Sequence, residues 1–121
     1  ERSQFVIITD SFYQFIAPFM RKLQLPTVLA HTLQINPQGK VTSYKLRLEH
    51  SKRRAVDALQ SIGYRVMATG DSYNDTAMLA HANLGVLFNP PSNVVAEFPQ
   101  FPVATSYEDL KVHAEPFFAG A

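Results

Sequence analysis

Two carboxylates and an amide lie close together in the stretch Gly70–Asp75, whose sequence is GDSYND. The stretch follows the apolar run Tyr64–Thr69, which predicts a strand buried on both faces, and precedes Thr76–Ala80, which predicts a helix. Parallel α/β sheets bind ligands at the carboxyl ends of their strands, where the amino termini of helices favour anions. A loop of this composition could therefore hold a phosphate and a hard cation.

Other interpretations of the same stretch stay open on spacing alone. Gly, Asp, Ser and Asn are ordinary turn and cap residues, so a purely structural loop is as good a prediction as a functional one. A calcium loop of the helix–loop–helix type is disfavoured, because it requires Gly at its sixth position, where this chain has Thr76. Evidence for chemistry must come from the rest of the chain.

Length and composition exclude several classes of protein. The 121 residues are 46% hydrophobic and carry a net charge of +1 without a basic face, so we expect a packed core and no binding of nucleic acid. The absence of cysteine excludes a disulfide scaffold and a thiol nucleophile. We predict no membrane segment and a cytoplasmic location, and the opening at Glu1 suggests that the chain begins inside a longer sequence.

A second junction between a strand and a helix is predicted near the start of the chain. Phe5–Ile8 predicts a strand, and Asp10 or Ser11 could cap a helix that runs to about Leu23. Apolar residues recur through this helix at a spacing that predicts one buried stripe: Phe12, Phe15, Ile16, Phe19, Met20 and Leu23.

The next segment predicts a β-hairpin. Residues 28–35 and 40–48 alternate in part between apolar and polar side chains, and they flank the turn sequence Asn36–Gly39. His31 and His50 have no partner at the spacing of a zinc site, so we assign them no metal role.

A helix is predicted from Ser51, as its N-cap, to Ile62. Lys52 lies in its first turn, on the same side as the apolar stripe. A cation there opposes the helix dipole by about 0.3–1 kcal/mol, which a bound anion would offset. The later segments predict a strand at Leu84–Phe88, a short helix near Asn93–Phe98 and a last helix capped by Ser106.

These polar groups are predicted to converge on one edge of the sheet, in the chain order Thr9, then Lys52, then Asp71 with Asn74 and Asp75. This order resembles the haloacid dehalogenase superfamily of phosphoryl-transfer enzymes, whose later motifs are a Ser or Thr after a strand, a Lys at the start of a helix and a Gly-Asp-x-x-x-Asp loop. The stretches 7–13, 70–75, 97–102 and 107–110 resemble its phosphoserine phosphatase branch, which includes phosphoserine–homoserine phosphotransferases. The resemblance covers about residues 4–111.

The resemblance implies a Rossmann-like α/β core with a parallel sheet, plus the hairpin, and Mg²⁺ as cofactor. It implies that Asp71 is a direct Mg²⁺ ligand, with Asp75 behind it, ordering the metal's water and the loop. It further implies that Asn74 contacts the substrate phosphate or its carrier, and that Lys52 neutralises the charge on the transferring group. At the junction that follows Phe5–Ile8, the resemblance implies that Thr9 donates its hydroxyl to a phosphoryl oxygen, helped by the amides of Asp10 and Ser11.

One departure from the family is large. Its first motif, Asp-x-Asp on a central amino-terminal strand, supplies the nucleophile, and this sequence contains no Asp-x-Asp. We therefore interpret residues 1–121 as a single, partial core domain that lacks the central strand and the cap. The predicted function in the intact protein is Mg²⁺-dependent phosphoryl transfer from phosphoserine, to water or to homoserine. The alternative is a truncated, non-catalytic binding or interaction module.

The predicted partner is a small phosphorylated amino acid. The strands Phe5–Ile8 and Val66–Thr69 are expected to lack the strand that the family places between them. Apolar strand edges with unpaired N–H and C=O groups promote association. We therefore expect the chain to associate with another copy or with the missing amino-terminal segment, or to rearrange so that these two strands come together.

Overall fold

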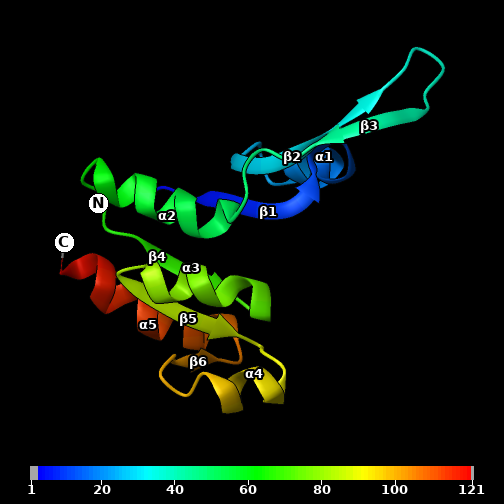
Figure 1. The fold of residues 1–121 in the computed structure, drawn as a ribbon. Coiled ribbons are helices and arrows are strands. Elements are labelled where there is room, and N and C mark those ends of the chain that lie inside the picture. The colour runs from blue at the N-terminus through cyan, green and yellow to red at the C-terminus, as the bar shows by residue number, and fades with distance from the viewer. Residues whose placement is uncertain (1–2, 121) are drawn as a thin grey trace. The chain divides into compact units, whose positions relative to one another are not determined.

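The computed structural model describes residues 3–120. The chain divides into two compact units, residues 1–51 and 52–121. Within the described residues, no helix is both long enough and apolar enough to cross a membrane. The α/β fold class is confirmed, because strands and helices alternate along both units (Figure 1).

The first unit contains a three-stranded sheet in the order β1-β2-β3. β1 (Val6–Phe12) leads into α1 (Tyr13–Lys22), and β1 pairs in parallel with β2 (Thr27–Ile35). β2 and β3 (Val41–Lys45) then pair antiparallel, and Figure 1 shows them as a long hairpin. The predicted hairpin is therefore confirmed.

A bulge interrupts the pairing of β1 with β2. Ile8 lies opposite Leu29 and Phe12 lies opposite His31, so four steps along β1 match two steps along β2. The three residues Thr9–Ser11 thus lie opposite the single residue between Leu29 and His31, and they leave the regular ladder, as bulges do when a strand must redirect side chains. The prediction that Asp10 or Ser11 caps the next helix is wrong, because β1 continues to Phe12 and no side chain caps α1.

The predicted apolar stripe of α1 is only partly buried. Met20 is buried, but Phe15, Phe19 and Leu23 are 61%, 63% and 58% exposed. The prediction that the whole stripe is core is therefore wrong for these three residues. The helical spacing is correct, since the three follow one another at intervals of four on one side of α1.

The second unit contains a parallel sheet in the order β4-β5-β6. Its elements are α2 (Ser51–Ser61, whose first residue ends the first unit), β4 (Met67–Gly70), η1 (Tyr73–Asp75), α3 (Thr76–His81), β5 (Leu84–Phe88), α4 (Ser92–Glu97), β6 (Val103–Ala104) and α5 (Tyr107–Ala119). β5 has the predicted bounds, and Ser106 caps α5 as predicted, because its hydroxyl accepts the N–H of Asp109. β4 starts later than predicted, because the N–H of Val66 is taken by the side chain of Asn83.

The core of the second unit lies between its sheet and its helices. Leu79, Val86, Leu87 and Val94 are at most 2% exposed, and α3 packs on β4 and β5 while α5 packs on β5 and β6 (Figure 1). Gly85 permits the close approach of α3, because a Cβ there would lie 2.4 Å from the carbonyl oxygen of Leu79. This packing holds the carboxyl end of β4 and the start of α3 in place.

Among the described residues, β1 and β4 are each the first strand of their own sheet, with one pairing edge unused. The expected absence of a strand beside each of them stays a prediction. The prediction that residues 1–121 form one partial domain stays a prediction.

Candidate functional site

The loop between β4 and α3 is organised by the carboxylate of Asp75. One of its oxygens, Oδ2, accepts the backbone N–H groups of Asp71 (3.0 Å) and Ser72 (3.2 Å) and the hydroxyl of Ser72 (3.2 Å). The other, Oδ1, accepts the ammonium of Lys52 at 2.7 Å. Four donors on one carboxylate fix the course of the backbone between Gly70 and Asp75.

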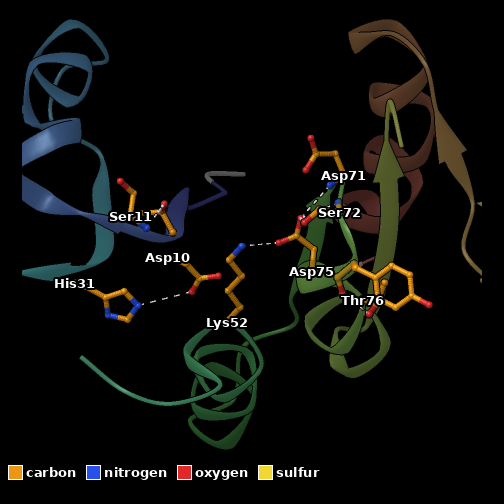
Figure 2. Close-up of polar contacts among 10 residues, drawn as sticks. Asp10, Ser11, His31, Lys52, Asp71, Ser72, Asp75 and Thr76 are labelled. Carbon is orange, nitrogen blue, oxygen red and sulfur yellow. Dashed lines mark hydrogen bonds and ion pairs between the residues drawn. The ribbon is translucent and has the colours of Figure 1, made fainter. Parts of the chain in front are cut away.

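The ion pair between Lys52 and Asp75 is mostly withdrawn from water, with 17% and 8% of the two side chains exposed (Figure 2). Burial alone would raise the pKa of Asp75. The hydrogen bond and charge of Lys52, with the N–H groups of Ser72 and Asp71, instead hold that pKa below its ordinary value of 3.8. Asp75 is therefore a carboxylate at neutral pH.

Gly70 leaves the space that this carboxylate occupies. A Cβ built at Gly70 would lie 2.5 Å from Cγ and from Oδ2 of Asp75. Any larger residue would displace Asp75 from its donors. The glycine of the loop is thus required by close packing with the acid five residues later.

The loop presents two polar side chains on its outer surface. Asp71 and Asn74 are both exposed, while Asp75 is buried beneath them. Asp71 offers carboxylate oxygens, the donors that Mg²⁺ prefers, and such sites commonly use one or two carboxylates with water and substrate phosphates. No group of three or more His, Cys, Asp or Glu that could hold a metal occurs among residues 3–120. Asp71 therefore fits a Mg²⁺ site, but it supplies only part of the ligands that the ion needs.

The second group of predicted residues lies in the Thr9–Ser11 bulge of the first unit. The hydroxyl oxygen of Thr9 accepts the N–H of Ser11 at 3.0 Å. This bond leaves the hydroxyl hydrogen of Thr9 for another acceptor, but it occupies one of the amides expected to help bind an anion. Asp10 is exposed, and its carboxylate lies 3.8 Å from Nε2 of His31 (Figure 2).

The structure thus gathers Lys52, Asp71, Asn74 and Asp75 in one unit and Thr9, Asp10 and Ser11 in the other. The predicted convergence of both groups on one site stays a prediction, as do the roles assigned to them. Sequence analysis missed His31, which is 5% exposed and contacts Asp10. Its place between Leu29 and Leu33 on the inward side of an alternating strand was the available signal.

Solved structures of phosphoserine phosphatases share the fold of this chain. The structure is similar to a probable phosphoserine phosphatase from Vibrio cholerae in its unliganded form, with a TM-score of 0.64 and 27% identity over 78% of this chain and 31% of that one. It also matches a phospho-aspartyl intermediate analogue of phosphoserine phosphatase, with a TM-score of 0.68 over 88% of this chain and 55% of that one. At 22% identity, the second match shows the fold alone.

Two curated relatives are more similar in sequence. Phosphoserine phosphatase ThrH of Pseudomonas aeruginosa is 53% identical over 111 residues, and phosphoserine phosphatase of Pseudomonas syringae pv. tomato is 50% identical over 111 residues. Each match covers 92% of this chain but 54% and 47% of the relatives, so the chain spans about half their length. No protein-family model matches the sequence. The chain is homologous to phosphoserine phosphatases of the haloacid dehalogenase superfamily, as the resemblance indicated.

Proposed function

We propose that the intact gene product containing this sequence removes the phosphoryl group from phosphoserine. The observation that carries the proposal is the identity of 53% and 50% to two phosphoserine phosphatases. Because each match covers 92% of the chain, it includes Lys52 and the Gly70–Asp75 loop. Transfer to water is the simplest reaction, and transfer to homoserine is the finer alternative.

Asp71 is the residue that would hold Mg²⁺. Its side chain is exposed on the loop, and its backbone is fixed by the bond from its N–H to Asp75. When bound, the ion would neutralise charge on the oxygens of the phosphoryl group. Asp75 does not face the solvent, so its part is to hold the loop rather than to contact the ion.

Lys52 would bring positive charge to the phosphoryl group. Phosphoryl transfer depends mainly on positioning and on stabilising charge, and an ammonium held by a buried carboxylate is positioned before the substrate arrives. The 2.7 Å bond to Asp75 fixes Lys52 by the same carboxylate that orders the Asp71 backbone. Asn74, exposed on that loop, is proposed to contact the phosphate or its carrier.

Thr9 would add a hydroxyl donor to a phosphoryl oxygen, since its oxygen already accepts the N–H of Ser11 and its hydrogen points elsewhere. We assign no nucleophile within these 121 residues, because the sequence contains no Asp-x-Asp.

The unused edges of β1 and β4 are proposed positions for further strands, from another copy or from a segment outside this sequence. Sedimentation of the purified chain tests association, and a stable monomer would contradict it.

Phosphate release by the purified intact gene product tests the function. We expect release from phosphoserine when Mg²⁺ is present and loss of release when a chelator is added. Added homoserine should accept the phosphoryl group only if the protein is also a phosphotransferase. Binding of phosphoserine without any turnover would contradict the proposal and favour a non-catalytic binding module.

A further inference from the structure

His31 is a buried histidine at the end of the Thr9–Ser11 bulge. It lies on β2 opposite Phe12, the residue at which β1 rejoins the ladder, and it is 5% exposed. The ring of Phe12 packs near it, with 6.2 Å between the centroids. A polar ring this deeply buried depends on partners inside the protein rather than on water.

The first nitrogen determines the tautomer. Nδ1 lies 2.8 Å from the backbone nitrogen of Arg47, whose N–H it accepts. A nitrogen that accepts a hydrogen bond carries no hydrogen, so the proton of the neutral ring is on Nε2. Protonation of Nδ1 would place two donors against each other and leave the Arg47 N–H unpaired.

The second nitrogen faces the bulge. Nε2 lies 3.8 Å from Oδ1 of Asp10, beyond hydrogen-bond length, so the N–H attracts the carboxylate as a dipole attracts a charge. The carboxyl side chain of Asp10 is 55% exposed and directly follows Thr9. Figure 2 shows the contact of the ring with Asp10, and the hydrogen bond to Arg47 joins the same ring to the backbone that follows the hairpin.

We propose that His31 is a positioning residue that orients Asp10 towards the substrate, with its Nε2–H tautomer fixed by the Arg47 N–H. The proposal rests on the proposed function, in which Thr9 contacts the phosphoryl group. A carboxylate beside that group repels phosphate, so Asp10 is suited to the other charged end of a phosphorylated amino acid, its ammonium. His31 acts through Asp10 and does not itself touch the substrate.

Two variants separate the two contacts of the ring. His31→Asn places an amide oxygen near the position of Nδ1, so it keeps an acceptor for Arg47 but does not reach Asp10. His31→Gln reaches the position of Nε2 and can donate to Asp10, but it leaves the Arg47 N–H without its acceptor. His50→Asn is the matched control, because His50 is an exposed histidine of the same unit.

Kinetics and urea unfolding of the intact gene product should then show opposite effects of the two variants on KM and on the unfolding midpoint. His31→Asn should raise KM for phosphoserine about tenfold with kcat unchanged and the urea midpoint retained. His31→Gln should lower the midpoint but keep KM near that of the unmodified protein. In an Asp10→Asn background, His31→Asn should have no further effect on KM. The KM for 3-phosphooxypropanoate, which lacks the ammonium, should not change in any of these variants.

Imidazole nitrogen NMR tests the same geometry without any turnover. We expect His31 in the Nε2–H tautomer and a shift of its Nε2 resonance in Asp10→Asn, with His50 unchanged. An Nδ1–H tautomer, or effects of His31→Asn and Asp10→Asn that add fully, would overturn the proposal. If the protein does not hydrolyse phosphoserine, the proposed function fails, while the NMR result still decides whether His31 holds Asp10.

Discussion

The two loops that carry the predicted site residues are held in different ways. In the second unit, the Gly70–Asp75 loop closes around one buried carboxylate that accepts four donors. In the first unit, Thr9–Ser11 is a bulge in a strand pair, in which the hydroxyl of Thr9 accepts the N–H of Ser11 at 3.0 Å. The Gly70–Asp75 loop is fixed from inside, whereas the Thr9–Ser11 bulge depends on its neighbours.

The side chains around the two loops also differ in how deeply they are buried. The loop of the second unit rests on a core whose largest side chains are at most 2% exposed. The first unit buries Met20 and Leu33 but exposes many large apolar side chains, including Phe5, Phe15 and Phe19. A carboxylate and a glycine can therefore specify one loop locally, while the geometry of the other is set by partners distant in the sequence.

Gly70→Ala should have the largest effect, because it disturbs the packing that orders the Gly70–Asp75 loop. The new Cβ would lie 2.5 Å from the Asp75 carboxylate, which must then leave its donors. We expect a loss of about 3 kcal/mol in the free energy of unfolding, measured with urea. Gly120→Ala, where a Cβ meets nothing closer than 3.4 Å, is the matched control. A Gly70→Ala protein as stable as the control would show that Asp75 does not fill that space.

Lys52→Met should have the next largest effect, because it leaves the Asp75 carboxylate, 8% exposed, without its ammonium partner. A loss of about 2 kcal/mol is expected, since three other donors remain on the carboxylate. Arg53→Met removes only an exposed pair with Asp57 at 3.9 Å and should change stability by less than about 0.5 kcal/mol. Equal losses in the two variants would mean that the start of α2 is merely solvated.

Acid should destabilise the Gly70–Asp75 loop by protonating Asp75. Its pKa is below 3.8 in the folded state, so its contribution to stability is present above that pH and is lost as the pH falls through the folded pKa. Asp109, fully exposed, also has a lowered pKa, chiefly because the Thr105 hydroxyl donates to it. Thermal unfolding between pH 6 and pH 2 should lose more of its acid dependence in Asp75→Asn than in Asp109→Asn. The reverse order would contradict the dominance of Asp75.

Thr9→Val should produce the smallest change, because it removes one neutral hydrogen bond and leaves no charge without a partner. The variant removes the acceptor of the Ser11 N–H in a partly buried position and should cost about 0.5–1 kcal/mol in urea unfolding. Thr32→Val, at an exposed position of β2, is the control and should be close to neutral. A larger loss for Thr9→Val than for Lys52→Met would reverse the comparison between the loops.

The sequence predicted the parts of the fold that depend on local pattern. The bounds of β5, the hairpin of β2 and β3 and the cap at Ser106 follow from apolar runs, turn residues and capping preferences within a few residues. The bulge was not predictable, because it exists only in the pairing of β1 with β2. The exposed face of α1 was also missed, since helical spacing identifies an apolar stripe but not what covers it.

The candidate site was predictable as a set of residue types but not as a set of contacts. Lys52 and Asp75 were both predicted as site residues, yet the hydrogen bond between them joins residues 23 apart in the sequence. The tautomer of His31 depends on Arg47, which is 16 residues away and attached through its backbone. Contacts of this kind require the tertiary structure, because no local preference encodes them.

Asp75 holds the loop from inside, and we propose that Asp71 faces the substrate. Asp71→Asn and Asp75→Asn of the intact gene product test these two roles most directly, with phosphoserine turnover and urea unfolding measured on the same preparations. Asp71→Asn should lower kcat by about 100-fold or more and leave the unfolding midpoint unchanged, because its side chain is exposed. Asp75→Asn should lower both quantities. Full turnover by Asp71→Asn, or an Asp75→Asn protein that keeps its stability, would contradict the account.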